Sequence, residues 1–291
     1  MALDMGGNIF PWISSPVIAC FVIFAITCPA FLYNETIAMQ PLMPLKLMTK
    51  TPIANLVYIN VFGLMAVNTV IFNIPLFYQA VLLTSASDSG LRLAIPACIG
   101  SFAGVVAGYS ITYTQRLKPS LVAGACFYVA GSFAICFIDK TVSELGSMAM
   151  LTVMLTGQGF TTPTAFISAL AVSEPGDQAM VTGALGLFRN LGLMLGVSIS
   201  SLVFQNALNA QLDLRVTGRA KQGIIERVRE SVRSIRYLEG DVKFAVIDAY
   251  AQSLRLTFVV AAVCTVLVFL LVVPIRLPRL TRRAPVAVAA E

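Results

Sequence analysis

The sequence contains no histidine among its 291 residues. This absence excludes the Ser-His and Cys-His pairs that activate a nucleophile, and it excludes the H-E-x-x-H motif of metalloproteases. The six cysteines all lie in apolar stretches without a C-x-x-C pair. They predict buried free thiols and support neither a disulfide framework nor a zinc site. We therefore expect a protein that is not an enzyme and has no metal or cofactor.

Charge is also scarce. Charged residues make up 12% of the chain, against about 25% in a soluble domain, and hydrophobic residues make up 57%. The mean hydropathy is +0.83. This composition predicts an all-α, polytopic membrane helix bundle in the lipid bilayer. The net charge of +6 comes from basic residues beside apolar spans, as in orientation signals, and predicts no nucleic-acid partner.

Seven apolar segments are long enough to cross a bilayer. They are residues 11–33, 55–82, 91–112, 120–138, 147–172, 183–206 and 254–275. Residues 207–252 interrupt the pattern with eight basic and six acidic residues. The apolar residues of this loop recur near the helical period and predict an amphipathic helix. They are Ile224, Ile225, Val228, Val232 and Ile235.

The positive-inside rule orients these spans. Lys46, Lys50, Arg116, Lys118 and the arginines of the tail fall on one side, which we expect to be cytosolic. The chain then divides into three parts: a linker transmembrane helix with a cytosolic loop (1–54), a six-helix bundle (55–275) and a cytosolic basic tail (276–291).

No aspartate or glutamate lies inside a predicted span, although proton-coupled carriers usually need a titratable group there. Arg189 is the one charge near the centre of a span. Arg189, Gly192, Gly196 and Ser200 fall on one helical stripe, whose small residues would let a neighbouring helix approach and enclose the guanidinium. Arg189 is then either a functional residue or a structural one that bonds carbonyls or an interhelical amide.

Other polar and small residues inside the spans leave similar alternatives. Asn68 and Gln79 share a helix face that Asn60 flanks, and these amides either join helices or line a substrate path. Residues 157–164 (GQGFTTPT) form helices weakly, so this segment either lines a cavity or marks a packing kink. The glycines at 100, 104 and 108 form a doubled G-x-x-x-G motif that predicts close helix packing.

Three segments, in this order, resemble the major facilitator superfamily. They are Ser89-Gly90-Leu91-Arg92-Leu93, the loop Gln115-Arg116-Leu117-Lys118-Pro119, and the stretch from Thr182-Gly183 through Phe188-Arg189-Asn190-Leu191-Gly192 to Phe204-Gln205-Asn206. The chain is most similar to the fungal fourteen-spanning drug:proton antiporters, which include multidrug and vacuolar basic amino acid transporters.

The resemblance implies that the first span is a linker helix and that the other six form the C-terminal half of the fold. The N-terminal six-helix half has no counterpart in the sequence, so we expect an incomplete gene model or a truncated product. The implied function is proton-coupled export of small organic molecules across the plasma or vacuolar membrane. Residues expected along the substrate path are Asn60, Asn68, Gln79, Gln158, Thr161, Arg189 and Asn190.

Two other classes of protein share part of this pattern. A half-carrier without transport activity of its own, or a structural membrane protein, is the alternative function. A G-protein-coupled receptor would also have seven spans, but the expected Asp-Arg-Tyr and Asn-Pro-x-x-Tyr motifs are absent.

Overall fold

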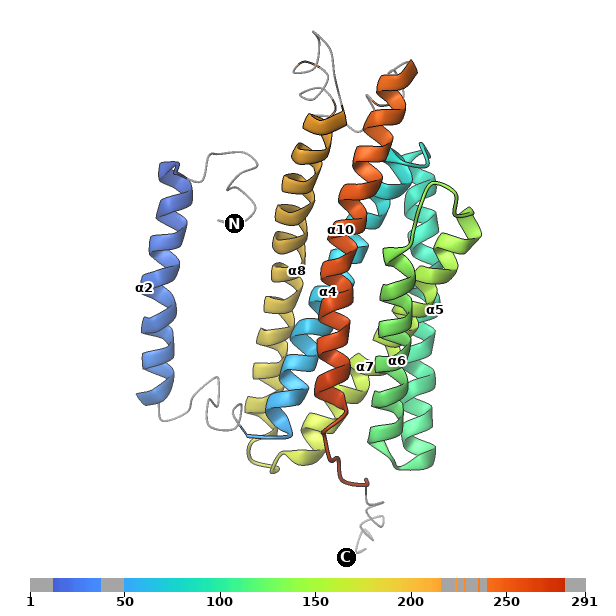
Figure 1. The fold of residues 1–291 in the computed structure, drawn as a ribbon. Coiled ribbons are helices and arrows are strands. Elements are labelled where there is room, and N and C mark those ends of the chain that lie inside the picture. Colours follow the sequence, from blue (N-terminus) through green and yellow to red (C-terminus); the bar gives the residue numbers. More distant parts are fainter. Residues whose placement is uncertain are drawn as a thin grey trace, which may run out of the picture.

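The computed structural model describes residues 13–37, 50–215 and 240–280, together with Gly223, Val228 and Ile235. This described part contains seven long helices and no β-strand (Figure 1). The helices are α2 (Ser15–Ile37), α4 (Ile53–Ala80), α5 (Ala86–Thr114), α6 (Leu117–Cys136), α7 (Glu144–Val172), α8 (Gln178–Arg215) and α10 (Gly240–Val272). The predicted all-α helix bundle is therefore confirmed.

Six of these helices are long and apolar enough to cross a membrane: α2, α4, α5, α6, α8 and α10. The predicted span 147–172 is also helical, as α7, but α7 is not among the six. Its 29 residues would suffice in length, and its polar middle, with Gln158 and five threonines, lowers its apolarity. Together the helices define an integral, multi-pass membrane protein.

Helix α4 is the centre of the bundle, and most of its span is buried. It packs against α8 and α10 on one side and against α7 on the other. Helix α7 in turn packs closely against α5 and α6, and α10 contacts α6. The bundle thus joins two groups of three helices, α4–α8–α10 and α5–α6–α7.

Serine caps begin two of these helices. The Ser85 hydroxyl accepts a hydrogen bond from the Asp88 amide at the start of α5, and the Ser143 hydroxyl accepts one from the Gly146 amide at the start of α7. Each cap satisfies an amide that has no partner inside its helix. Pro75 in α4 and Pro163 in α7 lie within helices that continue past them.

Helix α2 stands apart from the other six (Figure 1). Nearly all of its surface is exposed, including the large apolar side chains of Phe21, Phe24 and Ile26. Apolar side chains without protein neighbours are suited to contact with lipid. The role of α2 as a linker helix stays a prediction.

Helices α8 and α10 are longer than expected. Their 38 and 33 residues correspond to about 57 and 50 Å, against a hydrocarbon core of about 30 Å. The expected loop at 207–252 is therefore helical at both ends, with 207–215 in α8 and 240–252 in α10. The predicted amphipathic helix lies largely outside the described residues.

Candidate functional site

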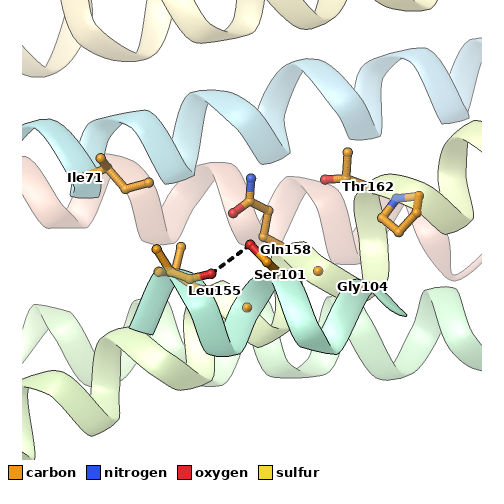
Figure 2. A pocket seen from close by; sticks show the side chains of 10 residues that line it. Ile71, Ser101, Gly104, Leu155, Gln158 and Thr162 are labelled. Atoms are coloured by element: carbon orange, nitrogen blue, oxygen red, sulfur yellow. Dashed lines mark hydrogen bonds between the residues drawn. The ribbon is translucent and has the colours of Figure 1, made fainter. Parts of the chain in front are cut away.

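A cavity of about 240 Å³ lies where α4, α5 and α7 meet (Figure 2). We call it the α4–α5–α7 cavity. Ile71 of α4 closes one side, and α5 and α7 supply the other walls. The remaining lining residues are Ala97, Gly100, Ser101, Gly104, Leu155, Gln158, Gly159, Thr162 and Pro163. Part of the segment 157–164 therefore lines a cavity while it remains helical.

Glycines place α5 directly against α7 at this cavity. A Cβ atom on Gly100 would lie 2.9 Å from the backbone oxygen of Leu155, and one on Gly104 would lie 3.4 Å from the backbone oxygen of Gly159. Only hydrogen fits at Gly100, so the helices approach closely. A Cβ on Gly108 would meet nothing within 4 Å, so Gly108, expected in the same motif, does not share this packing.

The polar groups of the cavity are neutral. Gln158 is partly exposed in the cavity, and its amide makes no hydrogen bond within the described part of the chain. The Ser101 hydroxyl donates to the Ala97 backbone oxygen at 2.9 Å (Figure 2). Thr162 adds a second hydroxyl. Because no charged residue lines the cavity, it can hydrogen-bond a ligand but offers no counter-ion.

The amides of α4 have different surroundings. Asn68 donates to the backbone oxygen of Leu193 in α8 at 3.1 Å and so joins two helices. Asn60 is buried and donates to Leu56 in its own helix at 3.0 Å. Gln79 is half-buried and makes no hydrogen bond with the described residues. None of the three lines the α4–α5–α7 cavity.

Thr161 lies on the opposite side of α7 from this cavity lining. It is 2% exposed, and its hydroxyl has no hydrogen-bond partner within the described residues. A Cβ atom on Gly124 of α6 would lie 2.5 Å from this hydroxyl oxygen. Thr161 is therefore a contact between α6 and α7.

The small-residue stripe of α8 is divided. Gly192, Gly196 and Ser200 are buried, and a Cβ on Gly192 or Gly196 would lie 2.5 or 2.6 Å from the backbone oxygens of Val61 or Met65 in α4. Arg189 and its neighbour Asn190 are exposed. The expectation that a neighbouring helix encloses the guanidinium is wrong for the described helices, because the buried face of α8 continues from Gly192 to Leu185 and Ala184 and not to Arg189.

Three features of the helix contacts were not singled out from the sequence. Thr69 of α4 donates its hydroxyl to Gly196 of α8 at 3.2 Å, and the Tyr128 hydroxyl of α6 donates to Gly63 of α4 at 3.0 Å. Gly131 of α6 lies against the Met154 backbone of α7. The spacing of seven between Gly124 and Gly131, which places both on one helix face, was the available signal for this last contact.

Several transporters are similar to the chain over most of its length. The chain is 31% identical over 272 residues to the multidrug resistance protein fnx1 of Schizosaccharomyces pombe, covering 90% of the chain and 50% of that protein. It is 28% identical over 260 residues to the vacuolar basic amino acid transporter 2 of Saccharomyces cerevisiae, with 88% and 55% covered. It is 27% identical over 270 residues to the MFS-type transporter GME11371 of Pestalotiopsis microspora, with 91% and 48% covered. No protein-family model matches the chain.

These similarities extend along nearly the whole chain. The chain is therefore similar to half of the length of MFS-type transporters, which are members of the major facilitator superfamily. It spans about half the length of the curated relatives that it matches.

Proposed function

We propose that the chain is the C-terminal half of a secondary active transporter that exports small organic molecules. The support is the similarity to relatives named as multidrug resistance proteins, amino acid transporters and efflux pumps. Transport occurs by rocking of this bundle against a second six-helix half, with the substrate site between the halves. The exporter operates in the plasma or vacuolar membrane.

The observation that carries the proposal is the α4–α5–α7 cavity within a membrane-spanning bundle. Its Gln158 amide has no described partner and is available to a ligand. A buried cation requires a compensating negative charge, and none lines the cavity. The lining therefore favours drugs or metabolites without a localised charge over basic amino acids.

Arg189 and Asn190 extend the proposed path beyond the cavity. Both are exposed on α8, and Arg189 lies 11 residues, or about 16 Å, from the start of that helix. A charge at such a depth is costly against lipid. We assign this face of α8 to contact with the second half, where Arg189 positions an anionic group of the substrate or an interhelical hydrogen bond.

Proton coupling is part of the same proposal. No carboxylate lines the α4–α5–α7 cavity, and the sequence offers none near the centre of a span. The group that binds the coupling proton is therefore assigned to the second half. Four other residues do not line the cavity and remain candidates for the path only if their helices move: Asn60, Asn68, Gln79 and Thr161.

The alternative is a half-carrier without activity of its own, or a structural membrane protein. Its support is the half-length match to the relatives. Co-expression separates the two functions: the chain is expressed alone and together with the part of the fnx1 protein that it does not match. We expect proton-dependent transport of an uncharged lipophilic drug in membrane vesicles only from the combination. Transport by neither preparation would favour the alternative.

Single substitutions then test the site. Gln158→Leu removes the free amide, and we expect transport by the combination to fall about tenfold, the equivalent of one hydrogen bond. Asn206→Leu is the matched control, because Asn206 is exposed on α8 and bonds only within its own helix. If Gln158→Leu and Asn206→Leu transport equally well, the cavity is not the site. If the Arg189→Ala variant transports at the wild-type rate, Arg189 does not have the proposed role.

A further inference from the structure

The described cations near one end of the bundle lack acidic partners. These are Lys50, Arg116, Lys118, Arg276 and Arg279, and we call this region the basic end. All five lie where α4 and α6 begin and where α5 and α10 end. None forms an ion pair with a carboxylate of the described residues, although Glu174 and Asp177 of the α7–α8 connection lie at the same end.

A second cavity, of about 300 Å³, opens at the basic end. It lies between the first turn of α4 and the residues that follow α10. Thr51, Pro52 and Asn55 form one wall, and Pro274, Ile275 and Arg276 form the other. Both helices are candidate membrane spans. The cavity therefore lies where the hydrocarbon core gives way to lipid headgroups.

The residues after α10 are held against the α5–α6 connection. The Lys118 ammonium group donates to the Val273 backbone oxygen at 3.2 Å, and the Leu280 amide donates to the Gln115 backbone oxygen at 3.1 Å. These contacts fix the direction of the chain between them, which includes Arg276 and Arg279. Arg276 and Arg279 are thus placed by these two contacts with the α5–α6 connection.

Arg116 and Arg279 face each other in an isolated antiparallel bridge. The hydrogen bond between their neighbours, Leu280 and Gln115, makes Arg116 and Arg279 a non-hydrogen-bonded pair. In such a pair the Cα atoms are about 4.5 Å apart. Like charges directly opposite one another repel, so an anion between or beside them would be stabilised. Arg276 is three residues from Arg279, at most about 10 Å along an extended chain.

We propose that the basic end binds the headgroup of an anionic phospholipid. Arg276 contacts the phosphate at the second cavity, with Thr51 and Asn55 as polar neighbours. The Arg116–Arg279 pair lies beside this phosphate and contacts any further negative charge of the headgroup. Arginine suits this ligand because its planar donors match phosphate oxygens. Basic pockets between membrane helices on the cytosolic side are suited to such headgroups, and the positive-inside rule predicts this side for the basic end. The proposal does not depend on transport.

The test measures lipid retained by the purified chain. The chain is equilibrated in detergent with phosphatidylserine or phosphatidylcholine, and native mass spectrometry counts the bound lipid at rising concentrations. We expect phosphatidylserine to be preferred, and its affinity to fall about fivefold for each cation removed in Arg276→Gln and Arg279→Gln. Both side chains are exposed, so folding, followed by circular dichroism, should not change.

Arg255→Gln is the matched control, because Arg255 lies at the opposite end and is paired with Asp139. It should keep the affinity of the unchanged chain for phosphatidylserine. Equal retention of the two lipids, or equal losses in Arg276→Gln and Arg255→Gln, would overturn the proposal. Displacement of phosphatidylserine by millimolar inorganic phosphate would identify a free anion as the ligand and would also overturn it.

Discussion

The two ends of the bundle differ in whether their positive charges form ion pairs. At the end opposite the basic end, four described cations are paired: Arg92 with Glu144, Lys140 and Arg215 with Asp248, and Arg255 with Asp139; Lys243 has no ion pair among the described residues. We call this the paired end. At the basic end, none of the five described cations has a carboxylate partner.

The difference separates two uses of basic residues in a membrane protein. At the paired end, charge joins different helices: Arg215 of α8 meets Asp248 of α10, and Arg92 of α5 meets Glu144 of α7. At the basic end, charge remains available to orient the protein and to contact lipid. Removing charge should therefore weaken helix contacts at the paired end and relieve repulsion at the basic end.

The largest effect is expected between the ends, at the contact that holds α8 against α4. Gly192→Val should lower the free energy of unfolding by about 3 kcal/mol, because its Cβ would lie 2.5 Å from the Val61 backbone oxygen. Gly186→Val is the control in the same helix, since a Cβ there meets nothing within 4 Å. Thermal unfolding in detergent measures both. Similar losses in the two variants would show that helix propensity, not packing, decides the result.

The second effect concerns the most enclosed cation of the paired end. The Arg92 side chain is 16% exposed, lies 2.8 Å from Glu144 and stacks over the Tyr78 ring at 5.7 Å. Arg92→Gln should destabilise the bundle by about 1 kcal/mol. The loss is limited because Nη1 of Arg92 is buried without a described partner.

Glu144→Gln sharpens this prediction. The amide keeps a hydrogen-bond acceptor for Arg92 but removes the charge, and the Glu144 side chain is 61% exposed. Its effect on the unfolding midpoint should be smaller than that of Arg92→Gln. A larger effect would mean that the ion pair, rather than the packing of the guanidinium on Tyr78, holds α5 at this end.

A third effect tests the exposed network of the paired end. Asp248 lies 3.0 Å from Lys140 and 3.6 Å from Arg215. Asp248→Asn should lower the free energy of unfolding by about 0.5 kcal/mol at low salt, because exposed pairs are weak. In 1 M salt the difference should vanish. Glu174→Gln, which removes an exposed carboxylate without an ion pair among the described residues, should show no loss at either salt concentration.

The paired end also shows where sequence reasoning stops. Apolar length and charge position predicted all seven described helices and the chain's membrane class, because bilayer thickness and backbone hydrogen bonding are local requirements. The pairing of Lys140 with Asp248 could not be predicted in this way. It depends on α10 beginning at Gly240, within a segment that charge alone assigned to a loop.

The candidate site shows a similar division. Gly100 and Gly104 follow the packing rule because α7 lies against them, whereas Gly108, with identical spacing, has no neighbour. Periodicity identifies a helix face but not which helix covers it. For the same reason Gln158 lines a cavity and Thr161, three residues later, is buried against α6. Arg189 differs from Gly192 on the same stripe because the buried face of α8 continues through Leu185 and Ala184 and leaves Arg189 exposed.

The smallest predicted effect has the opposite sign from those at the paired end. In lipid-free detergent at low salt, Arg279→Gln should raise the free energy of unfolding by a few tenths of a kcal/mol, because it removes one of two like charges in a cross-strand pair. Salt should abolish the gain, since the repulsion that it relieves is screened. Arg276→Gln is the control, because Arg276 faces no second arginine in a bridge and should change stability less. A loss of stability in Arg279→Gln at low salt would mean that this arginine contributes a favourable contact. Positive charge would then stabilise the fold at both ends.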